Sequence, residues 1–394
     1  MPEPAPFTHA HKRLLLIAGL LFMAFNLRPT ITSVSPVLRA MVEAMQLSGT
    51  AATLLTMLPV LCLGLAAPLA QYLARRLGTR LALAWVLAAL TLALLARPWS
   101  GVPGLFVGTL VAGMALGVIG ILLPGIVKHE FPRQAGLMTG LYTAILSIGA
   151  AAAAGATEPL RLALAGSWQG ALTFWALPAL LATVVWLPQA GMAHQKRPQP
   201  RPFSRLLRNP LAWQVTGYMG LQSALAYIVF GWLPTILVDR GMSAVAAGLA
   251  LSVSIIVQIA SAILAPWLSS RMRDERLTIA LLMACTLAGL AGCLYAPVSS
   301  LWYWIVLLGL GQGGTFSMAL TLLALRAPDA QSASQLSAMA QGFGYMLAAC
   351  GPLLAGLLHD WVGNWQATGV LYGAIGLAAL ALGLVAGRNK LIPG

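Results

Sequence analysis

Residues 14–37 read LLLIAGLLFMAFNLRPTITSVSPV, an apolar run long enough to cross a bilayer that holds one charged side chain, Arg28. About 20 apolar residues span the hydrocarbon core of a membrane as a helix. A guanidinium at that depth costs about 3 kcal/mol or more, so arginines within membrane helices usually face a water-filled cavity and serve a function. The run therefore predicts a membrane-spanning helix whose arginine belongs to an internal site.

The whole chain has the composition of a membrane protein. Hydrophobic residues make up 59% and charged residues 8% of its 394 residues, and the mean hydropathy is +0.84. A soluble domain has about 25% charged residues. The length of the first run favours a retained helix over a cleaved signal peptide. Twelve apolar segments are predicted to span the membrane, at 14–37, 49–73, 79–97, 102–127, 135–157, 166–187, 211–237, 244–270, 277–296, 301–325, 331–357 and 366–387.

Lysine and arginine are distributed unequally between the two sides of the predicted membrane. With the N-terminus in the cytoplasm, 18 of the 23 basic residues lie on the cytoplasmic side, and four (Arg39, Arg97, Arg161 and Arg240) lie opposite. Because basic loops are retained in the cytoplasm, we expect a multi-pass protein of the inner or plasma membrane with both termini cytoplasmic. The net charge of +14 reflects this bias, so the expected partner is the lipid bilayer and not nucleic acid.

The chain also divides into two halves. The basic, proline-containing stretch 189–209 is predicted to be a cytoplasmic linker between six-helix bundles at 1–188 and 210–394. Ser167-Trp168-Gln169 before the sixth segment recurs as Asn364-Trp365-Gln366 before the twelfth, 197 residues later. Parallel repeats place a binding site between two halves related by a pseudo-twofold axis. The predicted fold is an all-α membrane protein with twelve transmembrane helices in two pseudo-twofold six-helix bundles.

Several segments resemble those of one transporter superfamily, the major facilitator superfamily. Its loop motif is similar to Leu73-Ala74-Arg75-Arg76-Leu77-Gly78-Thr79-Arg80, in which Arg75 replaces the usual aspartate. Nearly the whole chain resembles the cyanate permease and 2-nitroimidazole exporter family within it. The segments that carry this resemblance are 26–29 (NLRP), 54–59 (LLTMLP), 122–128 (LLPGIVK), 231–234 (GWLP) and 339–345 (MAQGFGY). The resemblance implies the major facilitator fold, with Arg75, Arg76, Gly78 and Arg80 in a gating loop.

Polar side chains within the apolar segments are the candidate substrate-binding residues. Besides Arg28 they are Asn26, Thr56, Tyr142, Gln222, Tyr227, Gln258, Gln312 and Gln341. Each has an alternative role: Arg28 can snorkel to the headgroups, the amides can bond between helices, and the tyrosines can belong to interfacial belts. Trp232 and Pro234 are expected at the outer end of the seventh helix, in a gate region.

No enzymatic site is predicted. The five histidines lie outside or at the ends of the spans, and no lysine lies in a phosphate-binding Gly-Lys motif. We therefore expect no metal, no cofactor and no ATP. All nine carboxylates are expected in loops or at helix ends. Glu158 is the one candidate for proton coupling, and an outer-loop carboxylate is the alternative, so facilitative or exchange-like transport is expected.

The combined features predict a monomeric secondary transporter that works by alternating access around Arg28. A small anionic or strongly dipolar solute is expected, such as cyanate or a 2-nitroimidazole-like compound, because both present electron-rich atoms to a guanidinium. The alternative within the class is an efflux transporter of broader specificity for drug-like aromatics. The alternative from another class is a passive channel or a membrane receptor.

Overall fold

The computed structural model describes residues 9–131, 133–191 and 203–392, and every regular element within them is helical. Twelve helical segments are long and apolar enough to cross a membrane, one for each predicted span. Much of the stretch expected to be a linker, residues 192–202, lies outside the described residues. The helices are α1 (His9–Asn26), α2 (Pro29–Thr32), α3 (Val34–Met45), α4 (Gly49–Leu77), α5 (Thr79–Ala96), α6 (Gly101–Glu130), α7 (Ala135–Ala163), α8 (Trp168–Phe174), α9 (Ala176–Trp186), α10 (Pro210–Asp239), α11 (Ala244–Ser269), α12 (Arg276–Tyr295), α13 (Leu301–Leu325), α14 (Ala330–Val362) and α15 (Thr368–Ala386), with short 3-10 turns η1 (Leu187–Gln189), η2 (Phe203–Arg208) and η3 (Val298–Ser300).

The first span is broken in its middle. α1 ends at Asn26, and α2 and α3 resume the path after a turn at residues 27–28. Pro29 causes this break, because proline has no N–H to donate and restricts the backbone of the residue before it. Arg28 has φ −119° and ψ −33°, so its φ departs from the helical value of about −63°. The charged residue therefore lies where the helix is interrupted, a place tolerated at membrane depth only when it is covered by protein or borders a cavity.

Helix starts repeat between the two halves. Ser48 accepts a hydrogen bond from the Ala51 N–H at the start of α4, and Ser243 accepts one from Ala246 at the start of α11. Of the recurring segments, the first holds a cap, since Ser167 accepts from Gly170 at the start of α8. In the second, Asn364 accepts from Ala367 in the turn before α15, whose N-cap makes no side-chain bond. The serine side chains satisfy donors that a helix leaves free in its first turn. The Ser48 and Ser243 caps thus repeat between the halves, whereas the Trp168 and Trp365 segments differ in how they precede their helices.

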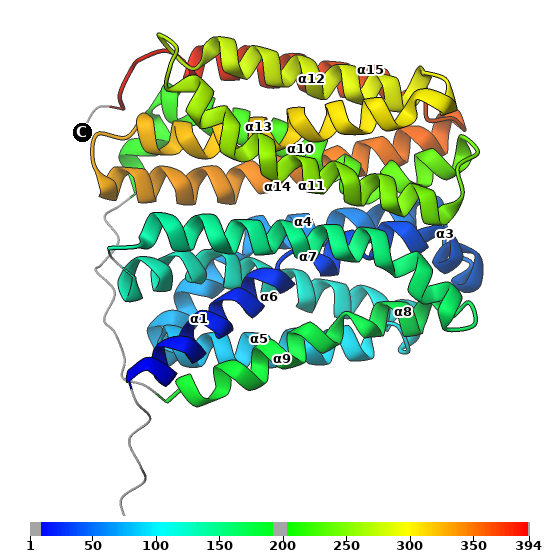
Figure 1. The fold of residues 1–394 in the computed structure, drawn as a ribbon, viewed down its shortest axis with the longest axis horizontal. Coiled ribbons are helices and arrows are strands. Elements are labelled where there is room, and N and C mark those ends of the chain that lie inside the picture. The colour runs from blue at the N-terminus through cyan, green and yellow to red at the C-terminus, as the bar shows by residue number, and fades with distance from the viewer. Residues whose placement is uncertain (1–8, 132, 192–202, 393–394) are drawn as a thin grey trace, which may run out of the picture.

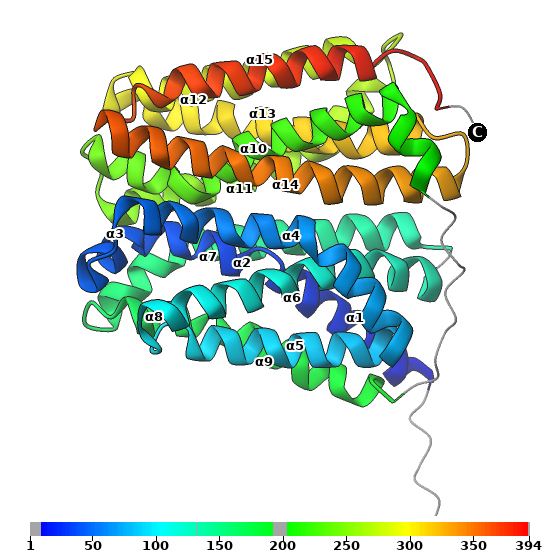
Figure 2. The same ribbon diagram turned by 180° about the vertical axis from the view of Figure 1, so that it is seen from behind.

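The helices form two bundles that lie side by side (Figures 1 and 2). α1–α9 make one bundle and α10–α15 the other, and they meet where α4 packs on α14, α7 on α11 and α3 on α10. α5 and α9 lie on the outside of the first bundle, and α12 and α15 on the outside of the second (Figure 1). These four helices belong to the third, sixth, ninth and twelfth spans.

The two ends of the molecule can be named from the path of the chain. We call the end that carries η1, η2 and the start of α10 the linker end, and the opposite end, where α3, α10 and α14 finish, the far end (Figure 1). Large aromatic side chains are exposed at both ends: Trp213 and Trp267 at the linker end, and Trp99, Tyr303 and Trp361 at the far end. Tryptophan and tyrosine are enriched at both interfaces of a membrane, so this distribution agrees with a bilayer across the bundles.

Candidate functional site

Arg28 is the centre of the candidate site. Asn26, Pro29 and Thr30 around it are buried, whereas the side chain of Arg28 itself is partly exposed. Within the described part of the chain, no carboxylate and no hydrogen-bond acceptor pairs with its guanidinium. A guanidinium has five N–H donors and no acceptor. Arg28 is therefore free to bind the electron-rich end of a solute.

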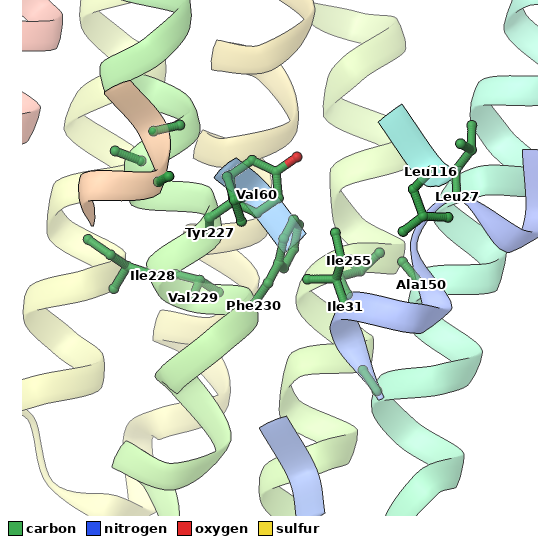
Figure 3. Close-up of a cluster of buried hydrophobic side chains, with 14 of the residues drawn as sticks. Leu27, Ile31, Val60, Leu116, Ala150, Tyr227, Ile228, Val229, Phe230 and Ile255 are labelled. Carbon is green, nitrogen blue, oxygen red and sulfur yellow. The ribbon is translucent and has the colours of Figure 1, made fainter. Parts of the chain in front are cut away.

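Three aromatic rings from the other bundle surround this guanidinium. The Arg28 Cζ atom lies 5.1 Å from the ring centre of Phe230, 5.8 Å from that of Tyr227 and 6.0 Å from that of Phe316. Cations within about 6 Å of an aromatic ring centre are attracted to the ring face. Figure 3 shows Tyr227 and Phe230 on the side of α10 that faces Ile31, one turn after Arg28. We call Tyr227, Phe230 and Phe316 the aromatic wall.

The spacing of the wall residues explains how they reach Arg28. Tyr227 and Phe230 are three residues apart on α10 and so lie on one face of that helix. Their rings meet edge to face with centres 5.8 Å apart, and the Tyr345 ring of α14 meets Tyr227 at 6.1 Å. Close packing of Gly220 against Gly344 draws α10 and α14 together. The contact extends the wall toward α14.

The predicted tyrosines differ in how the structure places them. Tyr227 lies beside Arg28 and meets the Tyr345 ring. Tyr142 is partly buried in α7. The ring contacts thus bring together Arg28 and Tyr227 of the predicted residues and add Tyr345, Phe230 and Phe316.

The two bundles are closed around this site at the far end. A Cβ atom built on Gly248 of α11 would lie 2.7 Å from the Ala154 carbonyl oxygen of α7, and one on Gly155 would lie 3.1 Å from Ser252. Gly356 of α14 packs equally tightly against Thr53 of α4. We call these contacts the far-end seam. Arg28 remains partly exposed although the seam closes the far end.

A comparison with known families identifies this architecture. The Major Facilitator Superfamily model matches residues 14–349, which is most of the chain. The chain belongs to the Major Facilitator Superfamily. Members of this superfamily move small solutes across membranes, so the protein is a multi-pass membrane transporter and not an enzyme.

Relatives within the superfamily cover nearly the full length. The 2-nitroimidazole transporter of Escherichia coli (strain K12) is 38% identical over 387 residues, 96% of this chain and 97% of that protein. The cyanate transport protein CynX of the same organism is 30% identical over 357 residues, 89% and 91% of the two chains. The crystal structure of a bacterial homologue of the human lysosomal transporter Spinster, in an inward-facing and occupied conformation, has a TM-score of 0.77 at 12% identity, with both chains fully covered. This last similarity concerns the fold alone.

Two of the predicted residues, Asn26 and Thr56, make hydrogen bonds within their own helices. Asn26 donates from its side-chain amide to the Phe22 carbonyl, 2.7 Å away, and so stabilises the last turn of α1. Thr56 of α4 donates to the Thr53 carbonyl at 2.9 Å. Thr56 also lines a small cavity between Arg28 and the far end. The cavity is lined by Ile31, Val34, Ser35, Leu55, Thr56, Pro59 and Gly231.

The four predicted glutamines have partners within their own bundle. Gln258 of α11 donates to Gln312 of α13 at 3.4 Å, and Gln312 donates to the Leu225 carbonyl of α10 at 3.3 Å. Gln222 donates to the Ser223 hydroxyl at 2.7 Å, and Gln341 donates to the Ser337 hydroxyl at 2.8 Å. The Gln258 and Gln312 bonds join three helices, as the alternative interhelical role predicts.

Glu158 is not a loop carboxylate, and this alternative interpretation is wrong. α7 continues through Pro159 to Ala163, because proline in the last turns of a helix removes one hydrogen bond without ending it. Glu158 is 3% exposed and accepts two hydrogen bonds from Arg161, at 2.9 and 2.8 Å. The carboxylate lies near the far end, in a pair with an arginine of its own helix.

The predicted gating residues also have defined places. Trp232 and Pro234 lie within the last two turns of α10, which continues to Asp239 at the far end. Trp232 donates to the Pro352 carbonyl of α14 at 3.0 Å and holds these two helices together. At the linker end, Arg75 and Arg76 are in the last turn of α4, and Gly78 has φ +79° at the turn that follows.

Arg80 of the loop motif pairs with Glu130 at the end of α6, with 2.6 Å between nitrogen and oxygen. The second bundle has a corresponding pair, Glu275 with Arg326, in which the charges are exchanged. The superfamily's loop therefore keeps an ion pair to the end of α6 although Arg75 replaces the aspartate.

Phe230 and Phe316 were not among the predicted site residues. Both lie in the middle of a span, away from the interfaces where aromatic residues usually gather. Phe230 also follows Tyr227 at helical spacing. These two signals were present in the sequence, but the approach of both rings to Arg28 depends on how the two bundles meet.

Proposed function

We propose that the protein is a secondary transporter that moves a small anionic or strongly dipolar solute by alternating access, with Arg28 as the central binding residue. One observation carries this proposal: the partly exposed guanidinium of Arg28 has no anionic partner in the described chain and faces three aromatic rings. A charge in a membrane protein without a protein partner is costly, so a solute that neutralises it gains binding energy.

The aromatic wall favours a flat solute. Guanidinium N–H groups can bind a nitro group or a carboxylate through two parallel hydrogen bonds. A ring attached to that group can then stack against Phe230 or Tyr227, since offset and edge-to-face contacts between aromatic rings stabilise by about 0.5–1.5 kcal/mol each. A 2-nitroimidazole-like compound, the solute named for one relative, uses both features. Cyanate, named for the other, uses the guanidinium alone.

The transport cycle follows from two bundles that share one site. In our proposal the bundles at 1–188 and 210–394 rock about Arg28, and the linker at 189–209 lies in the cytoplasm of a cell with this protein in its inner or plasma membrane. The excess of basic residues on the linker side supports this orientation. The far-end seam then corresponds to a closed outer side, and the described conformation is inward-facing.

The energy source that we propose is the solute gradient, with a contribution from membrane potential if the solute is charged. A unit charge that crosses the membrane exchanges about 2.3 kcal/mol per 100 mV. No carboxylate of the described chain pairs with Arg28, and Glu158 is bonded to Arg161. An efflux transporter of broader specificity differs from this proposal only in solute range. A passive channel differs in kinetics, because a channel does not support saturable counterflow in proteoliposomes.

The test is solute binding to purified protein and to Arg28 variants. We expect 2-nitroimidazole to raise the unfolding temperature of the wild type, Arg28→Ala to abolish this shift, and Arg28→Lys to restore part of it, since lysine lacks the planar fork. Arg271→Ala is a matched control, because Arg271 stacks on Trp267 at 3.9 Å on the exposed surface. An undiminished shift in Arg28→Ala would contradict the proposal and favour a snorkelling arginine.

A further inference from the structure

Among the described residues, one ion pair crosses between the bundles at the far end. Arg39 of α3 places its Nη1 atom 3.6 Å from the Asp239 carboxylate at the end of α10. The same guanidinium bonds through Nε to Glu43, one turn along α3, at 3.1 Å. Arg39 therefore has one acidic partner in its own bundle and one across the interface.

The two acids occupy corresponding positions in the repeat. Glu43 and Asp239 are 196 residues apart, between the 195-residue spacing of the Ser48 and Ser243 caps and the 197-residue spacing of the Trp168 and Trp365 segments. They differ in how they are held. Asp239 accepts a hydrogen bond from the Trp365 indole at 2.8 Å. In the described chain, the buried indole N–H of Trp168 has no such partner.

The Arg39–Asp239 contact joins the elements that build the candidate site. Arg39 follows Arg28 by 11 residues through α2 and α3, and Asp239 follows Phe230 by 9 residues on α10. At about 1.5 Å of rise per residue, the contact lies roughly 17 Å along the chain from Arg28 and roughly 14 Å from Phe230. Closure at Arg39 and Asp239 therefore accompanies closure of Arg28 on the aromatic wall.

We propose that Arg39 and Asp239 are positioning residues that latch the far end and thereby hold Arg28 against the aromatic wall. As a role in transport, this inference rests on the proposed function. Asp239, fixed by Trp365, is the stationary half of the latch. Arg39 is the half that moves, because Glu43 retains it when the bundles separate. When the latch opens, Arg39 loses Asp239 and keeps Glu43, the acid at the corresponding position of the repeat. The Arg39 guanidinium therefore stays paired.

The strength of the latch follows from its exposure. The side chains of Arg39 and Asp239 are 63% and 38% exposed, and exposed ion pairs of this kind shift an equilibrium by about two- to fivefold. Tight packing along the far-end seam supplies the rest of the closure. Loss of the pair should therefore increase the opening of the far end several-fold and leave the fold intact.

Reactivity of a cysteine beneath the latch measures this opening. Ser35 is 3% exposed and lines the small cavity between Arg28 and the far end, so Ser35→Cys reports the entry of water from that side. The background replaces the native cysteines with alanine. A membrane-impermeant thiol reagent is applied to intact vesicles, and Trp361→Cys, at a far-end position that is 87% exposed, identifies the side that faces it. The cysteines replaced are Cys62, Cys285, Cys293 and Cys350.

We expect Arg39→Gln and Asp239→Asn each to increase the labelling rate of Ser35→Cys two- to fivefold from the far-end side. Glu43→Gln is the matched control and should not increase the rate, because it removes the partner within the bundle and leaves the crossing pair. The exchanged pair Arg39→Asp with Asp239→Arg should bring the rate back toward that of the parent. The latch proposal would be wrong if Arg39→Gln and Asp239→Asn both left the labelling rate unchanged. It would also be wrong if Glu43→Gln increased the rate equally.

Binding separates the latch from the proposed function. Asp239→Asn should reduce the thermal shift produced by 2-nitroimidazole, and Glu43→Gln should not. One distinguishing result is a parent protein that shows no thermal shift with 2-nitroimidazole or cyanate while the latch variants still label faster. That result would support the latch and count against the proposed solutes. An undiminished thermal shift in Asp239→Asn would contradict the positioning of Arg28 by the latch.

Discussion

The guanidinium carbon of Arg28 lies 5.1 Å from the ring centre of Phe230, although the two residues belong to different bundles. Any rocking of the bundles changes this distance. Interactions that join Arg28 to the wall are thus available in one arrangement of the bundles and weakened in the other. A solute that fills the space between them shifts the equilibrium by the difference in its affinity for the two arrangements.

The first prediction concerns the ring of Phe230. Phe230→Leu keeps an apolar side chain and removes the aromatic face, which should cost about 1 kcal/mol of solute binding, or roughly a fivefold higher Kd for 2-nitroimidazole. Cyanate binding should change less, because cyanate has no ring to stack. Titration calorimetry of both ligands measures the difference. Phe174→Leu changes an exposed ring at the end of α8 that meets the buried Trp175 ring, and it should alter the binding of neither ligand. Equal losses of affinity for both ligands in Phe230→Leu would argue against stacking.

The second prediction concerns the ion pair of Glu275 and Arg326. Their side chains are only 11% and 4% exposed, and Arg326 also donates to the Ala386 carbonyl at 2.9 Å. Glu275→Gln leaves a buried guanidinium without its counter-charge and should destabilise the protein by about 3 kcal/mol. The measurement is thermal unfolding in detergent. The neighbouring Asp274→Asn is the control, since Asp274 pairs with Arg276 in a more exposed place. A decrease in unfolding temperature for Glu275→Gln no larger than that for Asp274→Asn would contradict the prediction.

The third prediction concerns Arg97, which the sequence assigns to the outer side of the membrane. The structure buries Arg97 to 1% exposure at the end of α5, and within the described chain its three side-chain nitrogens have no hydrogen-bond partner. Burial of one charge costs a protein several kcal/mol unless a partner compensates it, and an apolar side chain of similar size does not carry this cost. Arg97→Met should therefore raise the unfolding temperature.

Arg161→Met provides the contrast for Arg97. Arg161 is the partner of the buried Glu158, so its loss should lower the unfolding temperature. A lower unfolding temperature in Arg97→Met would show that its guanidinium has a stabilising partner.

The spans could be predicted from the sequence because membrane helices follow from hydropathy and length. Their ends could not, because a helix continues past the apolar region until its backbone is capped. The segment 14–37 continues to Met45, where Gln46 adopts φ +49°, and the segment 331–357 continues to Val362, where Gly363 adopts φ +76°. The break at Pro29 follows from proline chemistry. The recurring Trp168 and Trp365 segments were visible as a repeat, and the structure shows that the first caps α8 while the second forms the turn before α15.

The candidate site could be predicted in part. A charge within a span is conspicuous, so Arg28 stands out from sequence alone. The aromatic wall does not, because phenylalanine in a membrane segment resembles any other apolar residue until a cation is found beside it. The glutamines show the converse difficulty. A mid-span amide such as Gln312 is equally compatible with a site or with an interhelical bond, and only its contact with Gln258 and α10 identifies the bond.

The last prediction concerns energy coupling and depends on Glu158. Glu158 is buried, and a buried carboxylate is a stronger candidate for a proton carrier than the loop carboxylate that the sequence suggested. Its hydrogen bonds argue against that role, because Arg161 donates two charge-assisted bonds to the ionised carboxylate. Glu158 also belongs to the far end, and the described contacts connect it with Arg161 and not with Arg28. We therefore expect Glu158 to stabilise α7 and not to carry protons.

Reconstituted protein with an imposed pH gradient at zero membrane potential decides between these roles. The wild type should equilibrate 2-nitroimidazole without uphill accumulation, and Glu158→Gln should lower the unfolding temperature while leaving the ratio of internal to external solute unchanged. Arg161→Gln is the matched variant, because it breaks the same pair and keeps the carboxylate. Uphill accumulation that disappears in Glu158→Gln but persists in Arg161→Gln would make Glu158 the proton carrier, since only the loss of the titrating group would then abolish coupling.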